Sequence, residues 1–260
     1  MIVARGIRVR LGRKEVLHGV DFAARPGEVT AIVGPNGSGK TTLMRALTGE
    51  VDHEGTVEIG GRDIRRAKGW ELAARRAVLP QATTLAFPFT VVEVVRMGLM
   101  TGTHGEDATL PARALAEVGL AGHEGRFFQE LSGGEQQRAH LARVLVQVWH
   151  PVDAGGPRWL LLDEPVSSLD IAHQLEVMGI VASYARRGGG VVAVMHDLNL
   201  TALHADRIAV MQRGCLRAFG PPSEVMTDAI LSEVYGCRLR VGAAPEGPAP
   251  FVLPQCASPG

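Results

Sequence analysis

The order of secondary structure in this chain follows from one segment, Val29-Thr30-Ala31-Ile32-Val33-Gly34-Pro35-Asn36-Gly37-Ser38-Gly39-Lys40-Thr41. Its first five residues form a short apolar run, which is typical of a buried strand. The remainder matches the pattern G-x-x-x-x-G-K-[ST]. Residues 40–47 then have helical spacing, and Gly49 is suited to end a helix. We therefore predict a strand, a glycine-rich loop and a helix in direct succession.

The glycine-rich loop has the chemistry of a phosphate cradle. Its glycines let successive backbone N–H groups point inward at a helix N-terminus, whose dipole favours anions. In this pattern Lys40 reaches the β- and γ-phosphates of a nucleotide, and the Thr41 hydroxyl ligates Mg²⁺. The alternative is a glycine-rich turn with an ordinary surface lysine, but it does not explain the flanking strand and helix. The predicted nucleotide-binding residues are Gly34, Pro35, Asn36, Gly37, Ser38, Gly39, Lys40, Thr41 and Thr42.

Further apolar runs extend this unit into an α/β fold. Residues 159–162 (Trp-Leu-Leu-Leu) and 191–195 (Val-Val-Ala-Val-Met) are suited to central parallel strands that are covered on both faces. Residues 168–187, between them, have apolar positions at helical spacing. Strand, helix and strand in this order predict a right-handed crossover. The alternating segment 55–61 predicts another strand with a turn after it.

Residues 82–130 differ from the rest of the chain. They carry three basic and six acidic residues, and three minus six gives a net charge of −3. Helical patterns at 91–97 and 110–118 predict a small helical subdomain inserted into the α/β core. We expect a single domain over residues 1–240 that includes this subdomain, followed by a Pro-, Gly- and Ala-rich tail over 241–260.

The overall composition excludes several classes of function. The 260 residues include 27 Lys and Arg against 27 Asp and Glu, so the formal net charge is zero, which argues against broad binding of nucleic acid or anionic membrane. Cys215, Cys237 and Cys256 lack C-x-x-C spacing, so we expect neither a disulfide framework nor a zinc site. No apolar run approaches the roughly 18 to 20 residues that span a bilayer. We expect a soluble cytosolic protein without a signal peptide.

A second motif is Leu160-Leu161-Leu162-Asp163-Glu164. The apolar strand places Asp163 at its carboxyl end, where it can hold Mg²⁺ near the phosphate loop. Glu164 can then face a water in line with the γ-phosphate, and such a positioning group is what phosphoryl transfer to water needs. An acidic pair after a strand is by itself usually a solvated turn, and the phosphate loop is what favours the functional interpretation.

A third motif is Leu131-Ser132-Gly133-Gly134-Glu135. Ser132 and Glu135 have the spacing of a capping box, and an apolar stripe continues from Ala139. The simple interpretation is an ordinary helix start. The alternative is a second anion site, because the hydroxyl and the unobstructed N–H groups lie at the positive end of a helix. A second copy of the protein could in this way cover a nucleotide that the phosphate loop holds.

These three motifs together resemble the ATP-binding subunits of ABC transporters, over about residues 2–236. The resemblance implies a P-loop NTPase core of α/β class, with an antiparallel β subdomain and an inserted helical subdomain. It also implies that two copies pack head to tail around two ATP molecules. Each ATP would lie between the P-loop of one copy, which is the glycine-rich loop described above, and the signature residues of the other. The signature residues are Ser132, Gly133, Gly134 and Glu135.

The resemblance assigns further residues to the site. Gln81 matches the family glutamine that senses Mg²⁺ and the γ-phosphate, and His196 matches the switch histidine that contacts the γ-phosphate beside Glu164. Leu11 stands where the family usually has an aromatic residue that stacks on adenine. The implied catalytic residues are Lys40, Gln81, Glu164 and His196. The implied Mg²⁺ ligands are Thr41, Gln81 and Asp163, and the implied dimer-interface loop is Ser168, Leu169 and Asp170.

Residues 87–95, 196–202 and 220–225 are similar to those of importers for iron chelates, cobalamin and haem. The Pro/Gly-rich insertion at 150–158 resembles the haem-import subunits in particular. This resemblance implies an ATP hydrolase that drives haem uptake through two separate transmembrane permease subunits, at the cytoplasmic face of the inner membrane. A periplasmic or extracellular haem-binding protein would be an indirect partner. Permease docking is expected around Phe87 and Phe89, for which the alternative is local core packing.

Other functions stay open at this point. Within transport, the substrate could be a ferric siderophore or cobalamin. A soluble ABC-type ATPase acting on DNA or ribosomes is disfavoured, because Gln81 and Ser132 are only 51 positions apart without sustained heptads, and because the chain has one cassette and no basic patch. A binding module without catalysis is disfavoured because Gln81, Glu164 and His196 are all present.

Overall fold

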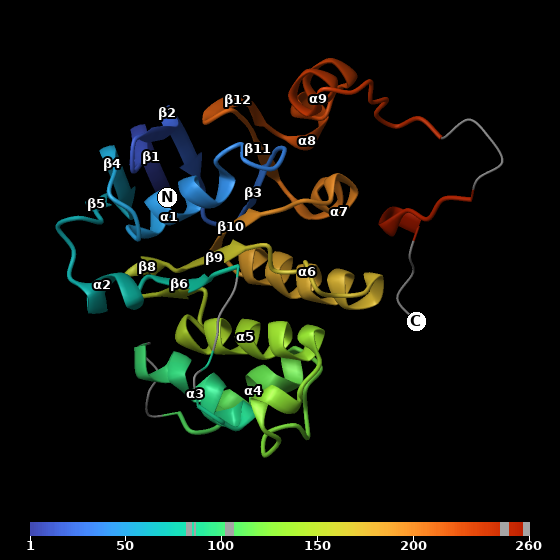
Figure 1. Ribbon diagram of the computed structural model, residues 1–260. Helices are drawn as coiled ribbons and strands as arrows, with labels where there is room; N and C mark the ends of the chain where they lie inside the picture. Colours follow the sequence, from blue (N-terminus) through green and yellow to red (C-terminus); the bar gives the residue numbers. More distant parts are fainter. Residues whose placement is uncertain (82–84, 86, 102–106, 245–249, 257–260) are drawn as a thin grey trace.

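The computed structural model describes residues 1–81, 85, 87–101, 107–244 and 250–256. Its centre is a six-stranded sheet with the strand order β12-β11-β3-β10-β9-β6 (Figure 1). Neighbouring strands from β11 to β6 run parallel, and β12 pairs antiparallel with β11. These strands are β3 (Val29–Val33), β6 (Arg76–Leu79), β9 (Trp159–Asp163), β10 (Gly190–Val194), β11 (Arg207–Gln212) and β12 (Cys215–Gly220).

The predicted apolar runs form the middle of this sheet, where every residue of β3, β9 and β10 is buried. Leu160 and Leu162 face the core that the sheet shares with α5 (Gly133–Gln147) and α6 (Ile171–Arg186). Leu161 points the other way, into the core shared with α1 (Lys40–Thr48). Continuous apolar runs suit strands that are covered on both faces, and the α/β class is confirmed.

A second sheet covers α1 from the other side. It is antiparallel, with the order β2-β1-β4-β5, and it forms the β subdomain that the family resemblance implies. Leu43 and Leu47 of α1 lie between the two sheets, in one buried cluster with Ile7 of β1 and Leu161 of β9. The strands are β1 (Ile2–Leu11), β2 (Lys14–Ala24), β4 (Glu54–Ile59) and β5 (Arg62–Asp63).

The helical subdomain lies below the six-stranded sheet in Figure 1. It contains α3 (Val91–Thr101), α4 (Leu110–Glu117) and the short η1 (Phe128–Glu130), and α5 packs against α3 and α4. A Cβ at Gly98 of α3 would collide with the backbone carbonyl of Arg143 in α5. The glycine therefore lets these two helices touch at the backbone, which places α5 in the helical subdomain as well as against the sheet.

The insertion at residues 150–158 forms an ordered hairpin of β7 (Val152–Asp153) and β8 (Gly156–Pro157). Arg158 follows the hairpin and is 2% exposed. Its guanidinium donates to Asp153 Oδ2 at 2.7 Å, and Arg75 lies 3.7 Å from the other oxygen of the same carboxylate. A buried cation and its partner carboxylate thus fasten the insertion to the start of β9.

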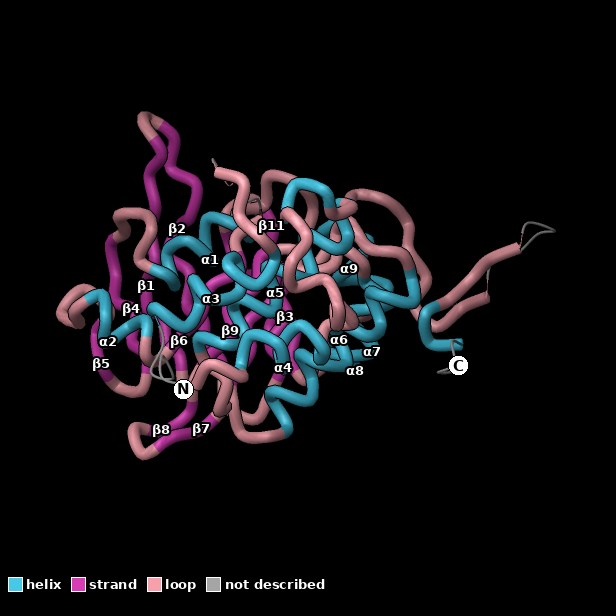
Figure 2. The backbone as a smooth tube through the Cα atoms, turned by 90° about the horizontal axis from the view of Figure 1, so that it is seen from below, coloured by secondary structure: helices cyan, strands magenta, loops and turns pink. Residues whose placement is uncertain are grey.

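The remaining helices include α2 (Gly69–Ala73), α7 (Leu198–His204), α8 (Pro222–Val225), α9 (Asp228–Tyr235) and η2 (Pro254–Cys256). The described end of the chain lies against α7, where Gln255 Nε2 donates to the Asn199 carbonyl at 3.0 Å. The antiparallel sheet and this C-terminal segment lie at opposite ends of the molecule (Figure 2). In the described part of the chain, no helix is both long and apolar enough to cross a membrane.

We predict that Trp159→Ala lowers the free energy of unfolding by about 3–5 kcal/mol, the usual cost of truncating a buried aromatic side chain. Trp159 is 1% exposed and its ring fills the space beside Gly190 of β10. Urea unfolding followed by circular dichroism measures the change. Trp70→Ala is the matched control, because Trp70 is 69% exposed and should cost below about 1 kcal/mol. Equal losses in the two variants would contradict this assignment of the core.

Candidate nucleotide-binding site

The glycine-rich loop between β3 and α1 needs glycine at two positions for different reasons. Gly34 has φ +148°, and a Cβ there would collide with the Met211 carbonyl of β11. Gly39 precedes α1 with φ +102°, and a Cβ there would lie 2.8 Å from the Leu17 side chain. Without side chains at these points, the loop can pass close to its neighbours and keep its backbone free for a ligand.

Lys40 is the first residue of α1, and its side chain folds back over the loop. Its Nζ donates to the carbonyl oxygens of Gly34 at 2.8 Å and Pro35 at 3.1 Å. Burial lowers the pKa of Lys40, and the negative charges of Glu164 and Asp163 oppose that decrease. A cation is therefore held against the carbonyl oxygens of the loop, close to where backbone N–H groups of this motif would contact a phosphate chain.

An open cleft of about 580 Å³ lies over this loop. The structure brings Gln81, Glu164 and His196 to this cleft, although they lie far apart in the sequence. Gln81 follows β6, Glu164 follows β9 and His196 follows β10, so all three leave the carboxyl ends of parallel strands. The full lining is Lys14, Val16, Asn36, Gly37, Gly39, Lys40, Thr41, Thr42, Gln81, Glu164 and His196.

Asp163 is buried beside Thr41, which lines the cleft, and the two residues fit a divalent cation. Burial, and next the charge of Glu164, raise the pKa of Asp163, whereas a hydrogen bond from Thr41 and the charge of Lys40 oppose the rise. Asp163 Oδ1 is buried without a hydrogen-bond partner. A buried carboxylate oxygen without a partner, next to a hydroxyl, suits Mg²⁺. This cation prefers oxygen ligands, and at a nucleotide site the protein usually supplies only one or two of them. Within the described ranges, no group of three or more His, Cys, Asp and Glu side chains forms a separate metal site.

Glu164 and His196 form a close pair at the mouth of the cleft. His196 Nε2 lies 2.5 Å from Glu164 Oε1. Glu164 has φ +55°, which is uncommon for a residue other than glycine. Its N–H donates to the Val194 carbonyl at 3.2 Å, and its own carbonyl accepts from the Ser167 hydroxyl at 3.3 Å. Backbone bonds on both sides thus hold the carboxylate in a strained turn, a feature that clusters at functional sites.

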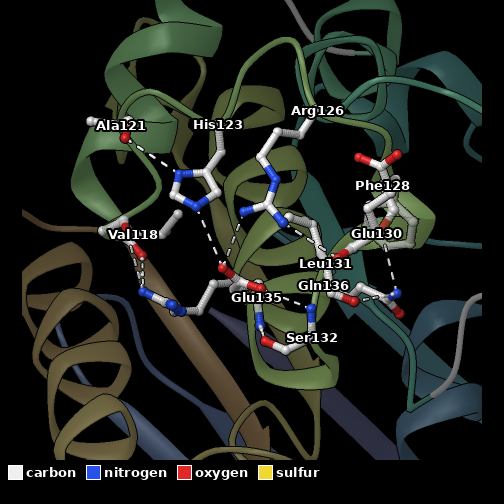
Figure 3. A network of polar contacts seen from close by, with 12 residues as sticks. Val118, Ala121, His123, Arg126, Phe128, Glu130, Leu131, Ser132, Glu135 and Gln136 are labelled. Carbon is white, nitrogen blue, oxygen red and sulfur yellow. Dashed lines mark hydrogen bonds and ion pairs between the residues drawn. The ribbon is translucent and has the colours of Figure 1, made fainter.

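The signature residues lie outside this cleft, at the start of α5 (Figure 3). Ser132 and Glu135 form the predicted capping box: Ser132 N–H donates to Glu135 Oε2 at 2.8 Å, and Glu135 N–H donates to Ser132 Oγ at 3.3 Å. Gly133 is exposed. A Cβ at Gly134 would lie 3.2 Å from the Leu169 side chain. The signature therefore packs against the loop of residues 168–170 of its own chain.

The predicted interface loop divides into buried and exposed parts. Leu169 is 9% exposed and belongs to the core, whereas Ser168 and Asp170 are exposed. Asp170 also caps α6, because its Oδ1 accepts from the His173 N–H at 3.0 Å. The structure assigns this aspartate a local structural role beside the one that the family resemblance implies.

Leu11, the residue at the family's adenine-stacking position, lies apart from the residues that line the cleft. Leu11 is 43% exposed at the hairpin between β1 and β2, and it is not among the lining residues. Lys14 and Val16 of β2 line the cleft instead. Sequence reasoning missed both, because they belong to a different sheet from the phosphate loop and follow no motif.

Comparisons with known proteins agree with this geometry. The family model described as ABC transporter matches residues 17–167. The hemin import ATP-binding protein HmuV of Roseobacter denitrificans is 62% identical over 255 residues, which cover 98% of each chain. The hemin import ATP-binding protein HmuV of a Jannaschia species is 60% identical over 257 residues, covering 99% of this chain and 95% of the relative.

Solved structures share the fold. An ATP-binding subunit of an ABC transporter superposes with a TM-score of 0.77 at 20% identity, covering 94% of this chain and 95% of the other. A nucleotide-free ATP-binding cassette from an ABC transporter gives 0.76 at 23% identity, covering 90% and 98%. The chain belongs to the ABC transporter family, as one of its ATP-binding subunits.

We predict that Lys40→Ala weakens ATP binding by at least about 100-fold, because it removes a buried cation whose bonds converge on the phosphate loop. Calorimetric titration of ATP into the purified chain measures the affinity. Lys68→Ala removes the same charge from an exposed position outside the cleft lining and should leave binding unchanged. Wild-type affinity in Lys40→Ala would sink the assignment of this cleft to the nucleotide.

Proposed function

We propose that this chain is the ATP-hydrolysing subunit of a haem importer, and that it couples ATP binding and hydrolysis to uptake through a separate transmembrane permease. The observation that carries the catalytic part is the convergence of Lys40, Gln81, Glu164 and His196 on one cleft. Relatives that are 56–62% identical over nearly their whole length are hemin import ATP-binding proteins, which supports haem as the substrate.

The residues at the cleft have different roles in the proposed ATP hydrolysis. The P-loop amides and Lys40 bind the phosphates, and the Glu164 carboxylate orients the attacking water and accepts its proton. His196 holds that carboxylate through their 2.5 Å contact and faces the same cleft. Thr41, Asp163 and Gln81 would hold Mg²⁺, which neutralises charge on the phosphates when bound.

A homodimer accounts for the position of the signature. Ser132, Gly133 and Gly134 lie outside the cleft of their own chain, yet Gly133 and Ser132 are exposed at a helix N-terminus. A second copy packed head to tail would bring these groups over the γ-phosphate of the nucleotide. Each of the two ATP molecules would then be held by both chains.

The remaining assignments concern the transport complex. Phe87 is 68% exposed, whereas Phe89 packs partly against the core. The exposure of Phe87 therefore supports permease docking at the helical subdomain. For Phe89, the contact with the core supports the alternative, which is local packing. The complex would contain two permease subunits at the cytoplasmic face of the inner membrane, supplied with haem by a periplasmic or extracellular binding protein. Residues 1–240 would act as the single ATP-binding domain, with 82–130 as its inserted helical part.

We expect Glu164→Gln to bind ATP normally, to hydrolyse it about 10²- to 10⁴-fold more slowly, and to accumulate as an ATP-bound dimer. Glutamine keeps a group that can bond to His196 but cannot accept the proton from water, and a general base contributes a factor of this size. Phosphate release and light scattering with Mg²⁺ and ATP measure the two effects. Glu117→Gln, at an exposed site on α4, serves as the control. A slow variant that stays monomeric would argue against the sandwich, and full activity would argue against Glu164.

The haem assignment is tested with the chain and its permease reconstituted in liposomes that contain the partner binding protein. Haem should stimulate ATP hydrolysis and accumulate in an ATP-dependent manner, and Glu164→Gln complexes should not transport. A ferric siderophore or cobalamin that stimulates hydrolysis where haem does not would replace haem as the substrate. If hydrolysis stays absent even with the permease, the transport function itself fails.

A further inference from the structure

The signature of this chain carries an ionised carboxylate where the proposed function brings phosphates. Glu135 lies in the first turn of α5, and the hydrogen bonds from Ser132 are the main cause of its lowered pKa. A first-turn carboxylate stabilises the helix itself. The same negative charge, however, opposes the approach of the phosphates that a second copy would present.

Arg126 and His123 converge on this carboxylate (Figure 3). Arg126 Nη1 lies 3.7 Å from Glu135 Oε1, and His123 Nε2 lies 3.4 Å from the same oxygen. The other oxygen, Oε2, accepts the Ser132 N–H. One oxygen of Glu135 thus holds the helix cap, and the other faces the Arg126 guanidinium and the His123 ring. Glu135 is 23% exposed, so the pair lies at the surface of one chain.

The segment that carries Arg126 is fixed to its surroundings by backbone bonds. The Val91 N–H donates to the Arg126 carbonyl at 2.9 Å, and the Val92 N–H donates to the Glu124 carbonyl at 3.1 Å. Arg126 Nη2 also reaches the Glu130 carbonyl at 3.4 Å. The guanidinium is therefore presented to the signature by the start of α3, which reduces the entropy cost of placing it there.

We propose that Arg126 is a positioning residue of the ATP sandwich. It neutralises Glu135, with His123 beside it, so that Ser132 and the following backbone N–H groups receive the γ-phosphate of an ATP held by a second copy. The inference rests on the proposed head-to-tail dimer. Arg126 and His123 lie outside the signature motif, and Arg126 has this neutralising role only because Glu135 is charged.

The test uses the full chain with Glu164→Gln as the background, so that the ATP-bound dimer accumulates. Arg126→Gln should raise the ATP concentration for half-maximal dimer formation by about fivefold, the upper range for one partly exposed charge pair. Arg126→Lys keeps the charge and should stay within about twofold of the background. ATP binding to the monomer at low protein concentration should not change, because the P-loop cleft is untouched.

The decisive comparison is made with Glu135→Gln. Glutamine also serves in a capping box, so this variant removes the charge and retains the cap. In Glu135→Gln, adding Arg126→Gln should change dimer formation by less than about twofold. Arg96→Gln, which removes an exposed arginine from α3 of the same subdomain, is the control for net charge and should match the background.

Each result distinguishes the possibilities. If Glu164→Gln alone forms no ATP-dependent dimer, the proposed function fails before Arg126 is considered. If that dimer forms and Arg126→Gln matches it, the inference is overturned. A loss that persists in the Glu135→Gln background would show that Arg126 acts on the nucleotide or the fold directly, which also overturns it. Melting temperatures within about 3 °C of the background would separate the charge effect from destabilisation.

Discussion

The whole site depends on one constraint, which is that β3, β10, β9 and β6 run parallel and end at a common edge. Val194 lies opposite Ile32 on one side and Asp163 on the other, and Leu162 lies opposite Leu79. Groups that follow these strands must therefore meet, whatever their distance in the sequence. The cleft exists because backbone hydrogen bonds hold this register and because apolar side chains cover both faces of the sheet.

Burying charged side chains at this edge of the sheet costs desolvation free energy, which contacts between the site residues partly offset. Lys40 and Asp163 are 6% and 4% exposed, and burial opposes the charged form of each. The attraction between their opposite charges reduces this cost for both residues. The Lys40 ammonium also donates hydrogen bonds to two P-loop carbonyl oxygens. Asp163 Oδ1 has no such partner. The part of the site left without a partner is thus a buried carboxylate oxygen, which would suit a cation such as the Mg²⁺ that accompanies a bound nucleotide.

Local patterns predicted the elements that local physics determines. The apolar runs became β3, β9 and β10, and the helix after Lys40 ends at Gly49, as helical spacing and glycine position indicated. The features that could not be predicted depend on contacts between distant segments. The backbone contact between Gly98 and Arg143 brings α5 into the helical subdomain. The apolar periodicity of either helix does not show which other helix it will contact. Lys14, Val16 and Arg126 reach their positions in the same way, through pairing with elements elsewhere in the chain.

The two halves of the proposed sandwich differ in charge, and this difference would set the order in which they bind ATP. The P-loop half presents the Lys40 ammonium at the start of α1, so it would attract the phosphates of a nucleotide without help. In the signature half, Arg126 offsets Glu135, and the cluster retains little positive charge beyond the helix dipole and any charge on His123. Such a surface would bind free nucleotide weakly, yet it would accept phosphates that a partner already holds. ATP would therefore bind one chain first, and closure by the second chain would follow.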